Sequence, residues 1–359
     1  MRVMILANND VGLYKFRKEL IEKLVEGHEV YMCLPNGDFI QELCTLGAKN
    51  IACNLLERHG TNPIKELRLL LYYKKILKRF KPDVVFTYTI KPNVYGGIAC
   101  ASLGIRYVVN ITGLGTAVEY RGLIQKITLA LYKVGLRNAQ KVFFQNIENR
   151  DFMVNRGVIK GAYDVLPGSG VNLNQYTVTE YPNGKTVDFL FIARIMKEKG
   201  IDQYMEMAEY IKNKYPKTQF HVCGICEQDY KNKLEEMQNR GIIIYHGLVS
   251  DMIMMYKISS CIIHPTYYPE GLSNVLLESC ACGRPIITTN RPGCREVVDD
   301  GVNGFIVKEK DSKDLIEKVE KFLKMSVEER KRMGLAGRKK IEKEFNRQIV
   351  IDKYLAEIE

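Results

Sequence analysis

Two glutamates, Glu270 and Glu278, are eight residues apart in the segment SCIIHPTYYPEGLSNVLLESCACGRPIITTN, residues 260–290. An apolar strand expected at 261–263 leads through a Pro/Tyr loop to a helix, which Gly283-Arg284-Pro285 would end. Eight residues are slightly more than two helical turns, so two acids on or near this helix project from one face. A helix N-terminus suits a phosphate-bearing ligand, so we expect the two carboxylates to bind uncharged hydroxyls instead. A surface helix with two solvated acids is the alternative.

Two cations, Arg194 and Lys199, follow the apolar strand expected at 188–192, and Lys199-Gly200 opens a helix. Cations beside a helix N-terminus form a site suited to a diphosphate, and a solvated basic loop is the alternative. No D-x-D triad ends a strand, because Asp299-Asp300-Gly301 in VVDDGVNG reads as a turn. We therefore expect no metal site and a metal-independent reaction.

The E-x7-E pair in its strand–loop–helix–strand context resembles the retaining glycosyltransferases of family 4, two-domain GT-B enzymes that use nucleotide sugars. Residues 193–200 resemble the family's G-R-x-x-x-x-K-G signature, with Ala193 where glycine is usual. The resemblance implies that Arg194 and Lys199 hold the donor pyrophosphate and stabilise the leaving nucleotide diphosphate. It also implies that Glu278 holds the ribose and Glu270 the donor hexose. The family uses no covalent nucleophile, since the leaving phosphate oxygen assists the acceptor hydroxyl on the same face.

Further donor-side residues are expected in the loops around these motifs. They are Gly12, Gly224, Gly271, Leu272, Ser273 and Asn274, and the loop 291–296 resembles the family's glycine loop near the donor sugar. Gly12 would let the backbone approach a ligand, although a plain helix-entry loop is equally consistent with it. The pair Cys223 and Cys226 forms the one C-x-x-C; a redox or zinc role lacks a second ligand pair, so we expect a strand end in a ligand-side loop.

The acceptor-side candidates follow two strands of the N-terminal half, in the stretches 88–97 and 110–115. They are Lys91, Asn93, Asn110, Thr112, Gly113 and Gly115. The histidine that many family members carry after one of these strands is absent. The segments resemble the subgroup that adds hexoses or N-acetylhexosamines to polyprenyl-diphosphate-linked sugars, including bacterial N-acetylgalactosaminyl transferases of polysaccharide and glycan assembly. This resemblance implies a UDP-sugar donor, with GalNAc or Gal as the sugar, and no cofactor.

Strand and helix patterns alternate along the whole chain, which predicts an α/β protein with parallel sheets. A length of 359 residues indicates two domains. We expect a GT-B architecture of two doubly wound, Rossmann-like domains that face each other across a cleft. The expected divisions are an acceptor-binding domain at 1–170, a linker at 171–186, a donor-binding domain at 187–342 and a C-terminal helix at 343–359 that packs back on the first domain.

The charge is uneven, because residues 65–160 contain 17 Lys and Arg against 5 Asp and Glu. Such a basic region implies an anionic partner, and no recognition motif accompanies it to favour nucleic acid. The segments 67–80 and 120–133 mix apolar stripes with cations, which is typical of helices that lie on an anionic membrane. A stripe that faces the core beside a solvated basic face is the alternative.

No apolar run is long enough to span a bilayer and no signal peptide is recognisable, so we expect a cytoplasmic protein on the inner face of the membrane. Ten cysteines without regular spacing fit reduced thiols. Two other functions remain open. One is a GT-B-type UDP-sugar epimerase, which needs no acceptor. The other is a non-catalytic partner of a transferase complex that binds a sugar nucleotide.

Overall fold

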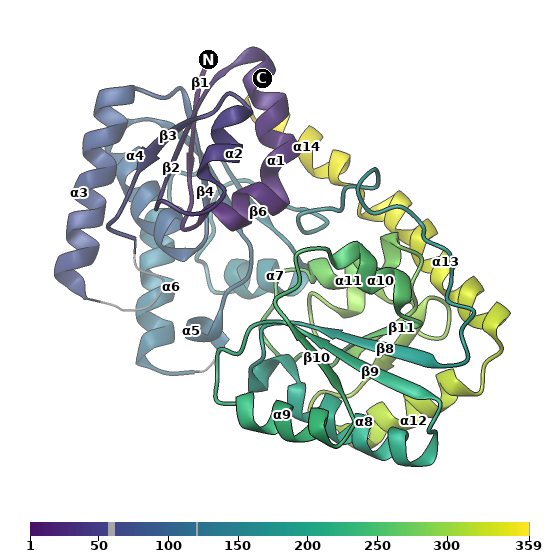
Figure 1. The fold of residues 1–359 in the computed structure, drawn as a ribbon. Helices are drawn as coiled ribbons and strands as arrows, with labels where there is room; N and C mark the ends of the chain where they lie inside the picture. The colour runs from purple at the N-terminus through teal and green to yellow at the C-terminus, as the bar shows by residue number, and fades with distance from the viewer. Residues whose placement is uncertain (57–61, 120, 359) are drawn as a thin grey trace. The chain divides into compact units, whose positions relative to one another are not determined.

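Two parallel sheets organise the chain in the computed structural model, which describes residues 1–56, 62–119 and 121–358 (Figure 1). They belong to two units, one of Met1–Ser169 with Gln348–Glu359 and one of Gly170–Arg347. Residues 171–186, where the sequence indicated a linker, are part of the second unit. None of the described helices combines the length with the apolar composition that crossing a bilayer requires.

The first unit contains a seven-stranded sheet of order β3-β2-β1-β4-β5-β6-β7, in which all neighbours are parallel. Its strands are β1 (Arg2–Leu6), β2 (Glu29–Leu34), β3 (Lys49–Ala52), β4 (Val84–Tyr88), β5 (Arg106–Ile111), β6 (Lys141–Phe144) and β7 (Tyr163–Val165). Its helices are α1 (Asp10–Gly27), α2 (Ile40–Thr45), α3 (Pro63–Phe80), the π-helix η1 (Pro92–Gly96), α4 (Gly97–Leu103), α5 (Thr116–Glu119), α6 (Leu123–Gly135) and α7 (Ile147–Asn155). The sheet thus reverses its order between β1 and β4.

Helices cover both faces of this sheet (Figure 1). One core packs α1 and α2 against the strands, together with Val350, Ile351 and Tyr354 of the C-terminal helix α14 (Arg347–Leu355). The other core packs α3, α4 and α6 against the opposite face. The C-terminal helix therefore returns to the first unit, as expected.

The second unit repeats this plan with six parallel strands in the order β10-β9-β8-β11-β12-β13. The strands are β8 (Val187–Ile192), β9 (Thr218–Cys223), β10 (Ile244–Gly247), β11 (Cys261–His264), β12 (Ile286–Thr289) and β13 (Gly304–Val307). The helices are the 3-10 turn η2 (Lys197–Lys199), α8 (Ile201–Lys214), α9 (Lys231–Asn239), α10 (Met252–Ile258), α11 (Asn274–Ala281), the 3-10 turn η3 (Arg295–Val297), α12 (Ser312–Leu323) and α13 (Val327–Glu344). Here the order reverses between β8 and β11.

The starts of two helices place candidate residues. Helix α1 begins at Asp10 because the Asn9 side chain accepts a hydrogen bond from the Gly12 N–H at 2.7 Å, so Gly12 lies in the first helical turn. Helix α11 begins only at Asn274. Glu270 therefore precedes the helix and does not share a helical face with Glu278. Pro269 disfavours helical conformation in the residue before it, which keeps this stretch a loop.

The buried Arg284 attaches residues 179–180 to the second unit. Its side chain is fully buried and donates to the Tyr256 carbonyl at 2.7 Å, to the Thr179 hydroxyl at 2.6 Å and to the Glu180 carbonyl at 2.7 Å. The Tyr256 carbonyl is buried with the guanidinium, so this bond satisfies an acceptor that water does not reach, and the other two bonds fasten residues 179–180. This explains why residues expected to form a linker are held against α10 and α11.

We expect Arg284→Met to lower the stability of the protein by about 3 kcal/mol or more, because several buried acceptors lose their donor together. The urea midpoint, followed by far-UV circular dichroism, should fall clearly below that of the wild type. The exposed Arg332→Met is the matched control and should stay within about 0.5 kcal/mol of it. An unchanged midpoint for Arg284→Met would contradict the role assigned to this side chain.

His264, the last residue of β11, is buried in the core of the second unit. Its Nε2 lies 3.2 Å from the Ser273 hydroxyl, and Nδ1 has no hydrogen-bond partner among the described residues. Burial, with a smaller contribution from the charge of Lys199, lowers the pKa of His264 to about 4. The imidazole is therefore neutral at neutral pH.

A pKa depressed on folding makes stability depend on pH in a defined window. The contribution of neutral His264 is complete above about pH 6.5, the unfolded value, and is lost as the pH falls toward 4, in total about 3 kcal/mol. His264→Asn cannot titrate, so its unfolding free energy should fall less steeply between these pH values. Equal slopes for the wild type and the variant in urea titrations would refute this assignment.

Candidate active site

The candidate site lies where the second sheet reverses its order, at the carboxyl ends of β8 and β11. Open α/β sheets bind ligands at this position because the loops diverge there. The loop after β8 carries Arg194 and Lys199, and the loop after β11 carries Glu270. The topology therefore brings together three residues that lie up to 76 positions apart in the sequence.

These two loops touch through Gly200, whose φ is +77°. A Cβ at this position would lie 2.1 Å from the Pro265 carbonyl oxygen, so only glycine allows the approach. Beside it, the Tyr267 N–H donates to the Glu198 carbonyl at 2.9 Å and the Thr266 hydroxyl to the same oxygen at 3.3 Å. The contact places the end of the η2 turn against the start of the Pro/Tyr loop.

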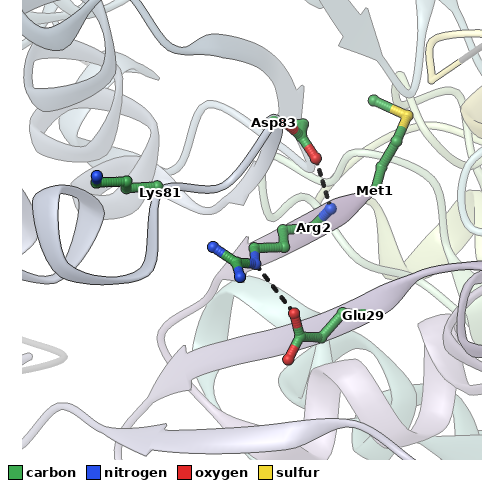
Figure 2. Close-up of a pocket in the computed structure, with 5 residues that line it drawn as sticks. All are labelled: Met1, Arg2, Glu29, Lys81 and Asp83. Atoms are coloured by element: carbon green, nitrogen blue, oxygen red, sulfur yellow. Dashed lines mark hydrogen bonds and ion pairs between the residues drawn. The ribbon is translucent and has the colours of Figure 1, made fainter.

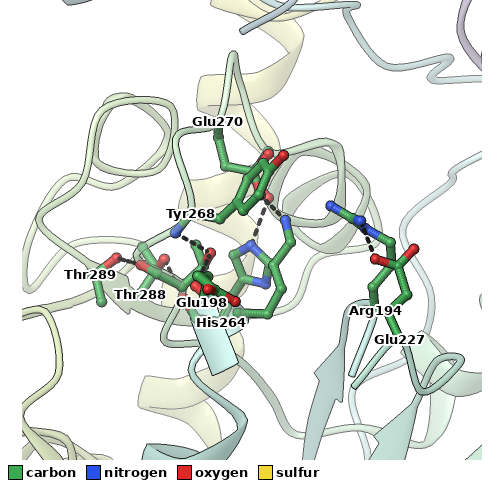
Figure 3. A network of polar contacts seen from close by, with 11 residues as sticks. Arg194, Glu198, Glu227, His264, Tyr268, Glu270, Thr288 and Thr289 are labelled. Atoms are coloured by element: carbon green, nitrogen blue, oxygen red, sulfur yellow. Dashed lines mark hydrogen bonds and ion pairs between the residues drawn. The ribbon is translucent and has the colours of Figure 1, made fainter. Parts of the chain in front are cut away.

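Both cations are paired with carboxylates, and Figure 3 labels the pair of Arg194 and Glu227. Lys199 Nζ, on a buried side chain, donates to a carboxylate oxygen of Glu270. Arg194 Nη1 lies 2.5 Å from an oxygen of Glu227, a residue in the loop after β9. Glu227 was not among the sequence candidates, since only the pairing of β8 with β9 brings it to Arg194.

Glu270 is held in its ionised form. Burial raises the pKa of its carboxyl, but the charge and hydrogen bond of Lys199 outweigh burial, so the net pKa lies below its ordinary value. An ionised carboxylate only accepts hydrogen bonds. Glu270 is therefore suited to bind hydroxyl groups, as the sequence indicated.

Glu278 lies in α11, and its Oε2 accepts a hydrogen bond from the Tyr256 hydroxyl at 2.9 Å. Burial together with the neighbouring Glu278 raises the pKa of Tyr176. The Tyr176 and Tyr256 rings meet edge to face, with centroids 6.3 Å apart. Neither tyrosine was a sequence candidate, because no local pattern relates them to Glu278.

The remaining donor-side candidates form the wall around Glu270. Leu272 and Ser273 are buried, and the Ser273 N–H donates to the Gly293 carbonyl at 2.7 Å. A Cβ on Gly293 would lie 2.7 Å from the Gly271 carbonyl oxygen, so the loop 291–296 abuts Glu270-Gly271. Within that loop, the Gly293 N–H donates to Glu296 at 2.8 Å. Asn274 is the first residue of α11.

Gly224 explains how the loop after β9 approaches Arg194. Its φ is +144°, and a Cβ there would lie 1.7 Å from the Ala193 carbonyl oxygen. Nearby, Cys226 Sγ lies 3.7 Å from the Tyr245 hydroxyl. Among residues 1–56, 62–119 and 121–358, no three His, Cys, Asp or Glu side chains are arranged to hold a metal ion.

The acceptor-side candidates lie in the first unit, at the carboxyl ends of β4 and β5. Asn93 and Asn110 are buried: Asn93 accepts from Thr87 at 2.8 Å and donates to the Asn110 carbonyl at 2.9 Å, while the Asn110 side chain donates to Tyr354 of α14. These amides connect two strand ends to the C-terminal helix.

The other acceptor-side candidates are more accessible. Lys91 is paired with Glu66 at 2.7 Å. Thr112, Gly113 and Gly115 are half-buried in the loop after β5, where both glycines have positive φ. Gly12 belongs to this unit as well, in the first turn of α1, and its donor-side role stays a prediction.

The first unit has a pocket that lies away from the end of the sheet at which such folds bind ligands (Figure 2). It is lined by Met1, Arg2, Glu29, Lys81 and Asp83. The Arg2 N–H donates to Asp83 at 2.7 Å, and the Arg2 guanidinium to Glu29 at 3.1 Å. These residues lie at the amino ends of β1, β2 and β4, opposite the end at which such sheets bind ligands.

Two family models match the chain. Residues 2–146 match the glycosyl transferase 4-like model, and residues 179–340 match the glycosyl transferases group 1 model. A relative from Campylobacter jejuni, N,N'-diacetylbacillosaminyl-diphospho-undecaprenol alpha-1,3-N-acetylgalactosaminyltransferase, is 28% identical over 94% of this chain and 92% of its own. The UDP-Gal:alpha-D-GlcNAc-diphosphoundecaprenol alpha-1,3-galactosyltransferase of Escherichia coli is 24% identical over 68% of this chain and 67% of its own.

Solved structures of other proteins share the fold of this chain. HepE of Anabaena, crystallised in complex with UDP-glucose, superposes with a TM-score of 0.81 at 16% identity and covers 100% of this chain and 99% of its own. The two matched models and the two doubly wound sheets agree with one another. The chain therefore belongs to the GT-B glycosyltransferases, with a glycosyl transferase 4-like domain followed by a group 1 domain.

Proposed function

We propose that this glycosyltransferase moves an N-acetylhexosamine or hexose, GalNAc or Gal first, from a UDP-sugar to a polyprenyl-diphosphate-linked saccharide, with retention of configuration. The observation that carries the proposal is the similarity over nearly the whole chain to an N-acetylgalactosaminyltransferase named for an undecaprenol-diphosphate-linked acceptor. The Escherichia coli relative, named for a UDP-Gal donor and a similar acceptor, supports the donor and the lipid carrier.

The candidate site supports the donor roles. Arg194 and Lys199 bind the two phosphates and stabilise the negative charge that develops on the leaving diphosphate. The bond from the sugar C1 to the phosphate oxygen breaks, a bond from C1 to the acceptor oxygen forms on the same face, and the acceptor proton passes to the leaving phosphate oxygen. With two cations at the diphosphate, we propose that the reaction needs no metal ion.

The two glutamates hold the uncharged parts of the donor. Glu270, ionised beside Lys199, accepts hydrogen bonds from hydroxyls of the sugar, and Glu278 accepts them from the ribose. Lys91, Asn93, Asn110, Thr112, Gly113 and Gly115 shape the acceptor side of the first unit, where the Asn93 and Asn110 side chains act by holding the strand ends together.

Nucleotide release from UDP- and GDP-sugars, with and without a polyprenyl-diphosphate-linked sugar in detergent, tests this function. We expect acceptor-dependent UDP release from UDP-GalNAc or UDP-Gal. Arg194→Ala should lower kcat by about 100-fold or more, because one stabilising contact to the leaving group is lost. Glu278→Ala should mainly raise KM for the donor.

The other outcomes separate the rival functions. Release without acceptor would indicate hydrolysis or epimerase chemistry. Tight donor binding without turnover, on every acceptor of the panel, would indicate a binding partner of another transferase. Near-wild-type activity of Arg194→Ala or Glu278→Ala would refute the role given to that residue.

We further propose that α3 and α6 bind an anionic membrane, where the lipid-linked acceptor resides. On α3, Ile64, Leu67 and Leu71 are 64%, 56% and 56% exposed, opposite the face that packs Leu69 and Tyr73 into the core. On α6, Leu123, Ile124 and Ile127 are 73%, 66% and 51% exposed. A stripe that faces the core does not account for these six side chains.

Charge complements this apolar surface. The exposed cations Arg68, Lys75, Lys78, Lys126 and Lys133 belong to the same two helices. Helices that combine exposed Leu and Ile with Lys and Arg bury their apolar side chains at the lipid interface while the cations attract anionic headgroups. Both helices lie on one face of the first sheet (Figure 1).

Flotation with vesicles of phosphatidylglycerol and phosphatidylcholine tests the membrane surface. Replacing Leu67, Leu71, Ile124 and Ile127 by Asp should weaken binding by about 100-fold or more, since each buried aliphatic side chain contributes about 1.5–3 kcal/mol. The matched control replaces four exposed aliphatic residues of the second unit by Asp, namely Ile244, Leu248, Ile258 and Val302, so that both variants gain the same charge. Equal binding of both variants, or wild-type binding that does not depend on phosphatidylglycerol, would refute this surface.

A further inference from the structure

Tyr268 lies in the loop between β11 and α11, beside Glu270 (Figure 3), and its ring contacts both cations of the candidate site. Lys199 Nζ is 4.7 Å from the centre of its ring, and Arg194 Cζ is 5.4 Å from the same centre. Both distances are within the range of a cation–π contact. One aromatic ring therefore contacts the two groups to which we assign the donor diphosphate.

The backbone around this ring is fixed on both sides. The Tyr268 N–H donates to the Thr266 hydroxyl at 3.2 Å, and the Glu270 N–H donates to the Tyr268 carbonyl at 2.8 Å. Thr266 is itself tied to β12 through its carbonyl, which accepts from the Thr289 hydroxyl at 2.5 Å. The backbone that carries the ring is thus attached to the core of the second unit, independently of the two cations.

The two carboxylates and the ring hold the cations in different ways. Glu227 and Glu270 neutralise Arg194 and Lys199, so a bound diphosphate must compete with them for the same charges. An aromatic face attracts a cation without carrying a net charge. The Tyr268 ring can therefore keep its contacts while phosphate oxygens replace the carboxylates.

We propose that Tyr268 is a positioning residue that sets the separation of Arg194 and Lys199 to match the two phosphates of a nucleoside diphosphate. The inference rests on the proposed function in that the diphosphate is the leaving group of the donor. Tyr268 touches neither phosphate; it acts through the two cations. The role depends on the ring and not on the hydroxyl.

The test compares binding of UDP and UMP, measured by isothermal titration calorimetry on the full chain. Tyr268→Leu removes the ring and should weaken UDP binding about tenfold while leaving UMP binding within about twofold, because the second phosphate needs both cations in register. Tyr268→Phe keeps the ring and should retain UDP affinity within about threefold. In the transfer assay, Tyr268→Leu should raise KM for the donor and lower kcat, and Tyr268→Phe should restore both.

Tyr267→Leu is the matched control. It changes the neighbouring residue of the same loop in the same way, but the Tyr267 ring contacts Lys310 at 4.7 Å instead of Arg194 or Lys199. We expect its ratio of UDP to UMP affinity to equal that of the wild type. Thermal unfolding by circular dichroism checks that all three variants are folded.

Several results would overturn the inference. One is an equal loss of UDP and UMP affinity in Tyr268→Leu, and another is a Tyr268→Phe variant that binds UDP as weakly as Tyr268→Leu. The others are a Tyr267→Leu variant that binds UDP as weakly as Tyr268→Leu, and a wild type with no preference for UDP over UMP. The binding comparison needs neither acceptor nor turnover. Absence of transfer with an intact, ring-dependent UDP preference would therefore refute the proposed function and leave the role of Tyr268 standing.

Discussion

The buried ion pair between Lys199 and Glu270 depends on a contact between two loops. These loops follow the neighbouring strands β8 and β11 at their carboxyl ends. Gly200 allows that contact because no side chain separates it from the Pro265 carbonyl. A lysine and a glutamate that are mostly removed from water stabilise each other only when their geometry is held from outside. The strand order of the second unit supplies that constraint, since β8 and β11 are paired at the point of reversal.

The surroundings of this pair keep its charges defined. His264, neutral in the core, lies next to the pair without adding a charge, and Ser273 binds its Nε2. Glu227 forms an ion pair with Arg194, as Glu270 does with Lys199. The free site therefore holds two cations and two carboxylates. In the function that we propose, a diphosphate brings its own negative charges to the cations and leaves Glu270 available to the hydroxyls of the sugar.

The first unit uses the same fold for a different purpose. Its strand ends carry amides that are bonded to each other and to α14, so the C-terminal helix is part of the structure that shapes the proposed acceptor side. Its outer helices α3 and α6 present aliphatic side chains and cations to the surroundings. The acceptor side and the membrane surface that we propose both belong to this unit, as a lipid-linked acceptor would require.

The sequence by itself determined the alternation of strands and helices, and with it the two doubly wound sheets, because short apolar runs and helical periodicity are local properties. It also indicated Arg194, Lys199, Glu270 and Glu278 as candidate site residues, because of their spacing after strands that the sequence predicts. Only the tertiary structure decided which groups meet them. Glu227, Tyr256 and Tyr268 have no local pattern that relates them to their partners, and they are brought there by strand pairing and by loop contacts. The tertiary structure also decided that α11 begins after Glu270 and that Ile124 and Ile127 face outward. An apolar stripe has the same spacing whether it faces the core or the surroundings, and the packing of the helix against its sheet settles the difference.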